Sequence, residues 1–453
     1  MSQQDSLPGV EKAAIIERDQ HPISRENISP NALKVLYRLD SAGFYAYLVG
    51  GSVRDMLVGK TPKDFDIATN ATPDELRSLF RNARIIGRRF KIVHIRFGRE
   101  IIEVTTFRAH HDPQNRIADN VSRRQIRGLD SAHSSSGMIL RDNVYGDIDE
   151  DALRRDFTVN ALYYTTDNFR VLDFSTGMKD LQSRLIRIIG DPVERYKEDP
   201  VRMLRALRFS AKLDFQIEEG TKRPINNLAH LLGSISSARL FDETLKLLTG
   251  GHAVKTFALL REYEVGEYLF APTLEALESE DNDEAACRLV DLALRNTDNR
   301  LAAGKSITPA FLFAALLWPV LKNRLATVST NQGNQYQSFQ ESANAVLNEQ
   351  LEYTAIPKRF TVAAREIWEL QLRLERRIRR SIESAFSHPR FRAAYDFLLL
   401  REESGEDLKG LGQWWTDFQI GDTKRRTELI SAVSTPEKRR RRRGKRKPLD
   451  ISV

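Results

Sequence analysis

Cysteine is nearly absent from this sequence of 453 residues, because Cys287 is its only cysteine. A single cysteine excludes an internal disulfide framework and cysteine-rich zinc sites, and it fits a reducing compartment. Long apolar runs are also lacking: the longest, at 311–321, is far shorter than the roughly 20 residues that a membrane-spanning helix requires. We therefore expect a cytoplasmic protein without an integral membrane segment, in which 311–321 is a buried helix.

Charge is not spread evenly along the chain. The net charge is +8, and residues 438–447 (KRRRRRGKRK) alone carry nine positive charges, so the remainder is close to neutral. A tail of this density is typically disordered and binds polyanions. Nucleic acid is the leading partner, and an anionic membrane surface is the alternative.

The chain is too long for one compact core, since domains split beyond about 250–300 residues. Apolar periodicity and turn residues indicate short alternating helices and strands in the first part and almost only helices from about residue 185. The regions we expect are a flexible N-terminus at 1–29, an α/β head at 30–165 with a disordered insertion at 110–137, a neck at 166–250, a helical body at 251–430 and a disordered polybasic tail at 431–453.

Two aspartates lie in a short segment, DFDI at 64–67, that we predict to be a strand. Because side chains alternate along a strand, Asp64 and Asp66 would project from the same face. Carboxylates held this close repel each other unless a cation lies between them, and Mg²⁺ prefers carboxylate oxygens. The pair is a candidate platform for one or two Mg²⁺ ions, although such a pair alone is more often a solvated strand end.

Gly50 and Gly51 follow a predicted strand at 44–49 and open a predicted helix at 52–59. Such a turn exposes backbone N–H groups that can bind phosphate oxygens. No Walker A lysine motif or extended Gly-x-Gly-x-x-Gly is present, so kinase and Rossmann interpretations have no support. The Gly-Gly turn, twelve further residues and then Asp-x-Asp form a pattern that resembles the nucleotidyltransferase superfamily that includes DNA polymerase β.

Longer motifs extend this resemblance over roughly residues 30–250. GGSVRD, RRDFTVNAL, GMKDL and EDPVRMLRALRF occur in this order and resemble the successive motifs of the class II nucleotidyltransferases, the bacterial CCA-adding enzymes and poly(A) polymerases. The resemblance implies a polymerase β-like α/β head followed by an all-α region. It also implies transfer of a nucleotidyl group to an RNA 3′-hydroxyl with two Mg²⁺ ions.

The same resemblance implies roles for individual residues. Asp64 and Asp66 would bind the metals, and Asp156 would be the third functional carboxylate, with Glu103 on a predicted strand at 99–108 as its rival. The implied nucleotide-binding residues are Gly50, Gly51, Arg54, Arg154, Arg155, Asn160, Asp199, Arg202, Arg205 and Arg208. The alternative for the Arg-Arg-Asp run is a surface ion-pair cluster, which would contribute little to stability.

Asp199 and Arg202 lie three residues apart on a predicted helix, so they are neighbours on one face. An aspartate accepts hydrogen bonds and an arginine donates them. Adenine and cytosine each present an amino donor beside a ring-nitrogen acceptor, whereas guanine and uracil present the reverse. The pair therefore suits A and C. The alternative is that Asp199 only caps the helix before Pro200.

Other segments favour poly(A) polymerase over CCA-adding enzyme. Residues 85–98 resemble a segment that marks the bacterial poly(A) polymerases, and 355–360, 388–401 and 412–419 resemble the gammaproteobacterial type. The resemblance implies template-independent polyadenylation with ATP as substrate, and RNA 3′ ends of mRNA fragments and small RNAs and RNA-decay proteins as partners. A CCA-adding enzyme and a catalytically inactive RNA-binding protein remain as alternatives. The expected RNA-binding residues are Arg88, Arg89, Lys438, Arg439, Arg440, Arg441, Arg442, Arg443, Lys445, Arg446 and Lys447.

Overall fold

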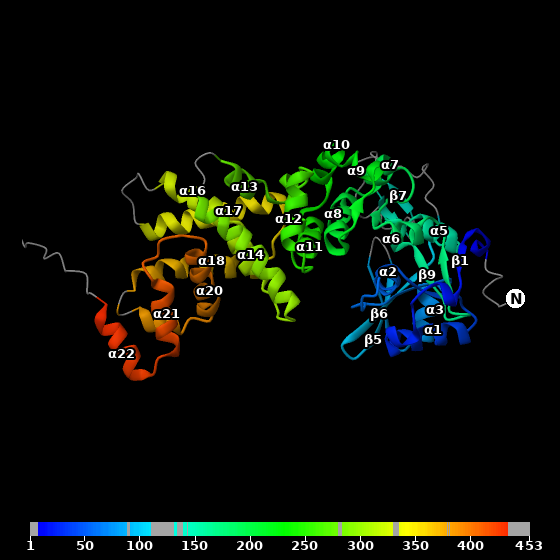
Figure 1. Cartoon of the computed structure of the whole chain (residues 1–453), viewed down its shortest axis with the longest axis horizontal. Helices are drawn as coiled ribbons and strands as arrows, with labels where there is room; N and C mark the ends of the chain where they lie inside the picture. The colour runs from blue at the N-terminus through cyan, green and yellow to red at the C-terminus, as the bar shows by residue number, and fades with distance from the viewer. Residues whose placement is uncertain are drawn as a thin grey trace, which may run out of the picture. The chain divides into compact units, whose positions relative to one another are not determined.

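A computed structural model describes residues 8–87, 91–109, 131–133, 139–142, 144–279, 283–328, 335–377, 379 and 381–433. The chain forms two compact units, 1–271 with 353–355 and 272–352 with 356–453 (Figure 1). The first unit contains a large sheet and the second is helical, which confirms the expected α/β head followed by an all-α region. The expected boundary between neck and body at 250–251 lies inside the first unit, where α12 (Ala253–Glu262) packs against α8 (Val201–Leu213).

An eight-stranded mixed sheet organises the first unit. Its order is β1-β10-β9-β2-β3-β6-β5-β4, in which β3 and β6 run parallel and the other neighbours run antiparallel. Burial alternates along β6, as expected for a strand with one face toward a core. The strands are β1 (Ala14–Ile16), β2 (Ala46–Val49), β3 (Asp66–Thr69), β4 (Ala83–Ile86), β5 (Ile92–Phe97), β6 (Glu100–Thr106), β9 (Leu162–Tyr164) and β10 (Val171–Asp173).

Two helices with strong capping signals pack on this sheet (Figure 1). Helix α1 (Pro30–Ser41) begins after Ser29, whose hydroxyl accepts the N–H groups of the first turn, and it packs against β2 and β6. Helix α3 (Pro73–Leu79) begins with a capping box between Thr72 and Glu75 and packs against β4 and β5. Thr72 at the N-cap and Pro73 at the first helical position are residue types that favour a helix start at these positions.

The N-terminal segment, which we expected to be flexible, joins the sheet from residue 8 onward. β1 pairs with β10, Ile23 is fully buried, and the ring of His21 lies 2.8 Å from the carbonyl oxygen of Phe169. Three short 3₁₀ helices connect these contacts, at Val10–Lys12, Arg18–Gln20 and Arg25–Asn27. A strand of three residues is too short to display an alternating pattern, so the sequence does not reveal it.

The remaining elements of the first unit surround the sheet or form the predicted neck. Most of the predicted insertion at 110–137 lies outside the described residues, and its described part, β7, pairs with β8. The elements are α2 (Gly51–Leu57), β7 (Ser131–His133), β8 (Ile139–Asp142), α5 (Ile148–Leu153), a 3₁₀ turn (Thr158–Asn160), α6 (Gly177–Gln182), β11 (Leu185–Ile186), α7 (Pro192–Glu198), β12 (Gln216–Ile217), α9 (Glu219–Lys222), α10 (Ile225–Leu228), a 3₁₀ turn (Ala229–Ser234) and α11 (Ser237–Leu248).

The second unit is built from helices around buried aromatic side chains. Trp368 is fully buried, and its indole nitrogen donates to the carbonyl of Ala314 at 3.0 Å. The apolar run at 311–321 is buried as predicted, but it forms two helices because Pro319 has no N–H to continue the first one. Its helices are α13 (Glu267–Glu278, shared with the first unit), α14 (Glu284–Ala302), α15 (Pro309–Leu316), α16 (Trp318–Val328), α17 (Gln335–Tyr353), α18 (Lys358–Arg376), α19 (Ile382–Phe386), α20 (Phe391–Glu403), α21 (Leu411–Ile420) and α22 (Thr423–Ala432).

A helix that crosses a lipid bilayer needs roughly 20 mostly apolar residues. Within the described ranges, no helix combines enough length with enough apolar character to cross a membrane.

Candidate active site

Asp66 is the first residue of β3, and its neighbours in the sheet place a second carboxylate beside it. In the parallel register of β3 and β6, Asp66 lies opposite Glu103. Asp64 precedes β3, so the expectation that both aspartates stand on one strand was wrong. The reason is that β2 ends at Val49, which pairs with Asp66, and the chain then turns at Gly50, so β2 offers Asp64 no partner.

The carboxylates around Asp66 interact electrostatically. Burial, followed by the charge of Glu103 and with a smaller effect of Asp64, raises the pKa of Asp66 to about 6, although Arg155 acts in the opposite direction. Glu103 is oriented by the ring of His94, whose Nε2 lies 3.0 Å from its carboxylate. Repulsion among carboxylates of this kind is relieved by a hard divalent cation, so the donor chemistry fits Mg²⁺. Among the described residues, however, no three side chains are arranged as a ready metal site.

The Gly50-Gly51 turn lies beside Asp66. Gly50 has a φ of 71°, a backbone conformation that favours glycine. A Cβ atom at Gly50 would lie 3.6 Å from Nη1 of Arg155 and 3.9 Å from Oδ2 of Asp66. The turn predicted to receive phosphate therefore faces both a metal-ligand candidate and a partly buried arginine.

Asp156 is engaged in a partly buried ion pair with Arg205. Its Oδ2 accepts a hydrogen bond of 2.6 Å from Nε of Arg205, and its Oδ1 accepts from Nδ2 of Asn160 at 3.1 Å and from the N–H of Phe157 at 2.8 Å. Burial alone would raise its pKa, but Arg205 and these hydrogen bonds outweigh burial and lower the pKa to about 2. This geometry favours Glu103, which lies beside Asp66, over Asp156 as the third metal-binding carboxylate.

The two arginines of the RRDFTVNAL motif have different surroundings. Arg155 contacts the hydroxyl of Tyr163 at 2.7 Å and Asp151 at 3.1 Å, and it lines the site. Arg154 instead donates to the carbonyl of Ala109 at 2.5 Å, and burial lowers its pKa to about 9. Arg154 does not line the cavity described below, so its predicted contact with triphosphate or ribose has no support in the structure.

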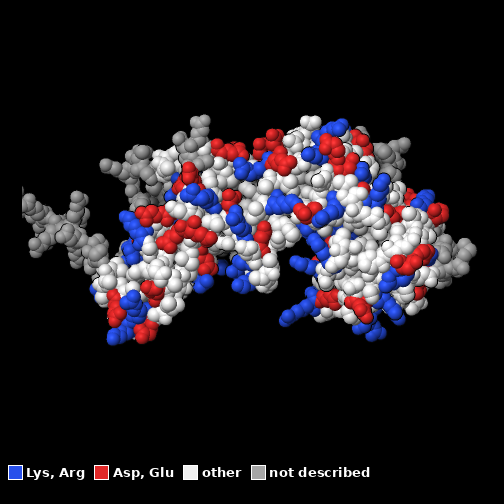
Figure 2. Space-filling view, viewed as in Figure 1, with Lys and Arg blue, Asp and Glu red and all other residues white. Residues whose placement is uncertain are grey.

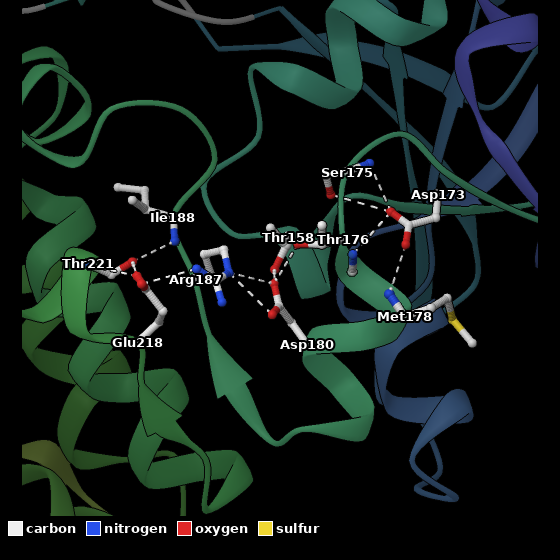
Figure 3. Close-up of polar contacts among 11 residues, drawn as sticks. Thr158, Asp173, Ser175, Thr176, Met178, Asp180, Arg187, Ile188, Glu218 and Thr221 are labelled. Carbon is white, nitrogen blue, oxygen red and sulfur yellow. Dashed lines mark hydrogen bonds and ion pairs between the residues drawn. The ribbon is translucent and has the colours of Figure 1, made fainter.

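A buried carboxylate holds this motif in place (Figure 3). Asp180, in the GMKDL motif, is 2% exposed and accepts hydrogen bonds from the hydroxyls of Thr158 (2.8 Å) and Thr176 (2.9 Å). Nε of Arg187 donates to the same oxygen at 3.1 Å, and the N–H of Thr158 donates to the carbonyl of Arg187 at 2.9 Å. Since Thr158 directly follows Asp156 and Phe157, these bonds fix the position of the segment that carries Asp156.

The residues predicted to read the base have separate partners. Oδ2 of Asp199 accepts a hydrogen bond of 2.6 Å from Nη2 of Arg239, and Oδ1 accepts the N–H of Val201 at 3.3 Å. Nη1 of Arg202 donates to the carbonyl of Arg195 at 2.7 Å and to Glu198 at 2.8 Å. Arg239 on α11 is a site residue that the sequence analysis missed, because one arginine on the polar face of a helix is not distinctive.

These elements enclose a cavity of about 1000 Å³ within the first unit. Arginines contribute much of its wall: Arg54, Arg205 and Arg208 lie over the ring of Phe209 at 5.0, 5.3 and 4.9 Å. Figure 2 shows exposed Lys and Arg atoms in the region of α8, α11 and α12. The predicted site residues that line this cavity are Gly50, Gly51, Arg54, Asp64, Asp66, Arg155, Asp156, Asn160, Asp199, Arg202, Arg205 and Arg208.

Comparison with known proteins was made for the whole chain. Residues 46–187 match the poly A polymerase head domain, 214–277 match a probable RNA and SrmB-binding site of polymerase A, and 331–448 match the polymerase A arginine-rich C-terminus. The chain is 48% identical over 440 residues to poly(A) polymerase I of Salmonella typhimurium, covering 96% of this chain and 92% of that protein. The chain belongs to the poly(A) polymerase I family. It is therefore a nucleotidyltransferase.

More distant relatives of the family agree with the fold. The CCA-adding enzyme of Lactobacillus helveticus is 37% identical over 237 residues, covering 52% of this chain and 54% of that enzyme. The solved CCA-adding enzyme of Bacillus stearothermophilus in complex with CTP has a TM-score of 0.54 at 23% identity and covers 90% of each chain. The second similarity concerns the fold alone.

The predicted RNA-binding residues of this family member cannot be placed. Arg88, Arg89 and the basic residues of 438–447 lie outside the described residues. Their assignment as RNA contacts stays a prediction.

Proposed function

We propose that this chain is a template-independent poly(A) polymerase that transfers AMP from ATP to an RNA 3′-hydroxyl, releases pyrophosphate and promotes RNA decay. The observation that carries the proposal is the 48% identity to poly(A) polymerase I over 96% of the chain. The CCA-adding alternative is a more distant relative that covers about half of the chain. The inactive RNA-binding alternative has less support, because Asp64, Asp66 and Glu103 are all present.

The carboxylate group gives the proposal its chemistry. Asp64, Asp66 and Glu103 would hold the divalent ions, which we propose to be two Mg²⁺. When bound, such ions lower the pKa of the attacking hydroxyl and neutralise the triphosphate and the departing pyrophosphate. Arg155 and the N–H groups of the Gly50-Gly51 turn would orient the triphosphate beside Asp66. The reason is that the side chains of Arg155 and Asp66 both lie within 4 Å of the position that a Cβ atom would take at Gly50.

Base choice would rest on Asp199 and Arg202, supported by Arg239. An ionised Asp199 is an acceptor only, which suits the amino groups of adenine and cytosine. The ion pair with Arg239 fixes the orientation of the carboxylate. A preference for ATP over CTP does not follow from this pair, so we attribute it to the family.

We expect the Arg239→Met variant to lose discrimination against GTP and UTP by roughly tenfold, because Asp199 loses the partner that orients it. The measurement is kcat/KM for each of the four nucleotides with one RNA primer. Lys246→Met is the matched control, since Lys246 lines the cavity from the same helix but pairs with Glu243. Equal selectivity in both variants would contradict the role of Arg239.

RNA and RNA-decay proteins are the proposed partners, and the cytoplasm is the proposed location. The family description for 214–277 names RNA and SrmB, which supports RNA as a partner. The single cysteine, Cys287, fits a reducing compartment. The polybasic segment at 438–447 would tether RNA without regard to sequence.

Replacing the nine basic residues of 438–447 by Gln, with the chain length kept, should weaken RNA binding and reduce its salt dependence. Each lost phosphate contact lowers the slope of log K against log[salt] by about 0.7 for single strands. Turnover on saturating primer should stay the same. RNA titrations at several NaCl concentrations measure this, and an unchanged slope would show that the segment is not the tether.

The experiment that tests the proposed function is primer extension with a generic RNA and Mg²⁺, in which each nucleotide is offered separately. A tRNA lacking its 3′ end is extended in parallel. Long extension of the generic RNA with ATP alone is the expected result. Addition of a few C and A residues to the tRNA only would identify a CCA-adding enzyme, and binding without extension would favour the inactive alternative.

A further inference from the structure

A second, smaller hollow adjoins the nucleotide cavity of the first unit. It has a volume of about 550 Å³ and lies where the ends of α2, α6 and α8 meet the start of α12. Lys60, Lys212 and His252 line both the hollow and the cavity, so the two form one continuous surface. Nothing in the reaction described above uses the smaller hollow.

Positively charged side chains predominate in the lining of this hollow. Among the described residues that line it, Lys60, Arg184, Lys212 and Lys255 are cationic and Asp214 is the one acidic residue. Lys212 belongs to the wall shared with the cavity, where its Nζ lies 3.1 Å from Asp55. The two cations found only in the smaller hollow, Arg184 and Lys255, both pair with Asp214.

The two ion pairs of Asp214 are exposed to solvent, so another anion can take the place of its carboxylate. The side chain of Asp214 is 73% exposed, and those of Arg184 and Lys255 are 64% and 46% exposed. The nearest Arg184–Asp214 approach is 3.7 Å, longer than a good hydrogen bond, whereas Nζ of Lys255 donates a close hydrogen bond to Oδ1 of Asp214. Exposed pairs of this kind contribute little, so an incoming phosphate can replace the carboxylate of Asp214 at little cost.

We propose that this hollow binds phosphodiester groups of the RNA primer just upstream of its 3′ end, and that Asp214 acts as an internal competitor for the same cations. The proposal rests on the proposed function. The growing strand must bring its 3′-hydroxyl to the carboxylates of the cavity, and the adjoining hollow offers its backbone the next cationic surface. Grooves of positive charge that follow the backbone are typical of proteins that bind single strands.

The position of the hollow favours a polymer over a single nucleotide. Arg202, proposed to read the base, lies in the first turn of helix α8 (Val201–Leu213), and Asp214 is its C-cap, so the two are separated by a rise of about 18 Å at 1.5 Å per residue. An extended strand of several nucleotides spans this distance. The competing explanation is structural, because cations at the C-terminal ends of α2, α6 and α8 also offset the partial negative charge of those helix ends.

The test uses the full-length chain and a short oligoribonucleotide of mixed sequence. The double variant Arg184→Gln/Lys255→Gln should raise KM for RNA roughly threefold to tenfold and lower the salt slope by about one to two, with kcat and KM for ATP unchanged. Asp214→Asn should act in the opposite direction and lower KM for RNA about twofold. Asn is well suited to this position, because residue 214 has a φ of 60° in the left-handed region that Asn tolerates.

Lys34→Gln is the matched control, because Lys34 is an exposed lysine of α1 that lines neither hollow nor cavity. A lower melting temperature of the double variant without a change in KM for RNA would establish the structural explanation and overturn the proposal. A change confined to KM for ATP would assign the hollow to the triphosphate and also overturn it. If the unaltered chain adds no AMP at all, the proposed function fails, and titration of the same variants with labelled RNA still decides the role of the hollow.

Discussion

The Asp66→Asn variant should lose at least about a thousandfold of its AMP incorporation and remain folded. Asp66 lies beside the Gly50 turn and opposite Glu103, at the centre of the carboxylate group. An amide has almost the same shape as the carboxylate but carries no charge to bind a divalent cation, and losses of this size follow when such a group is removed from a reacting centre. Single-turnover AMP transfer at saturating Mg²⁺, ATP and RNA measures the loss.

The same substitution should stabilise the metal-free protein, which separates inactivity from misfolding. Because the pKa of Asp66 is raised to about 6 in the folded chain, the folded state binds more protons than the unfolded state between its ordinary pKa of 3.8 and about 6. Stability of the unaltered protein therefore falls as pH rises through this window and stays lower above it. Asp66→Asn should melt at a higher temperature at pH 7–8 in chelator, and the gain should vanish near pH 4.

Asp64→Asn is the control for this pH effect. Asp64 is exposed and precedes the strand, so the melting temperature of the Asp64→Asn variant should change much less than that of Asp66→Asn. Its activity should also fall if it binds metal. An Asp66→Asn variant that remains active, or that loses stability at every pH, would contradict the assignment of Asp66.

Substitutions at Glu103 and Asp156 should differ in their effects on activity and on stability. We expect Glu103→Gln to lower kcat by at least about a hundredfold with little change in melting temperature, since Glu103 is half-exposed and beside Asp66. Asp156→Asn should instead destabilise the fold by about 2 kcal/mol, because it leaves the partly buried guanidinium of Arg205 beside a neutral group. Thermal melts and single-turnover rates of both variants measure the two effects.

The double variant Asp156→Asn/Arg205→Met completes this comparison. It removes both charges of the ion pair, so it should regain much of the stability lost in Asp156→Asn. Full activity of Glu103→Gln, together with an inactive but normally stable Asp156→Asn, would reverse the assignment and make Asp156 the third metal-binding carboxylate.

The local features of this protein could be predicted because neighbouring residues in the chain cause them. The helix start at Thr72-Pro73, the turn at Gly50 and the strands β5 and β6 depend on capping, on glycine and on apolar alternation within a few residues. The site candidates around Asp66 followed from long motifs whose order along the chain is preserved. By contrast, the three-residue strand β1 depends on pairing with β10 and carries no local pattern of its own.

Sequence alone determined the two-part architecture, the family and twelve of the 29 residues that line the cavity, since motif order and periodicity are properties of the chain. Only the tertiary structure showed which charged side chains pair with one another. Asp156 pairs with Arg205 and Asp199 with Arg239, partners that lie 49 and 40 residues apart, while β3 and β6 align Asp66 with Glu103. The physical reason is that electrostatic partners are chosen by distance in space and by burial, and a linear sequence specifies neither.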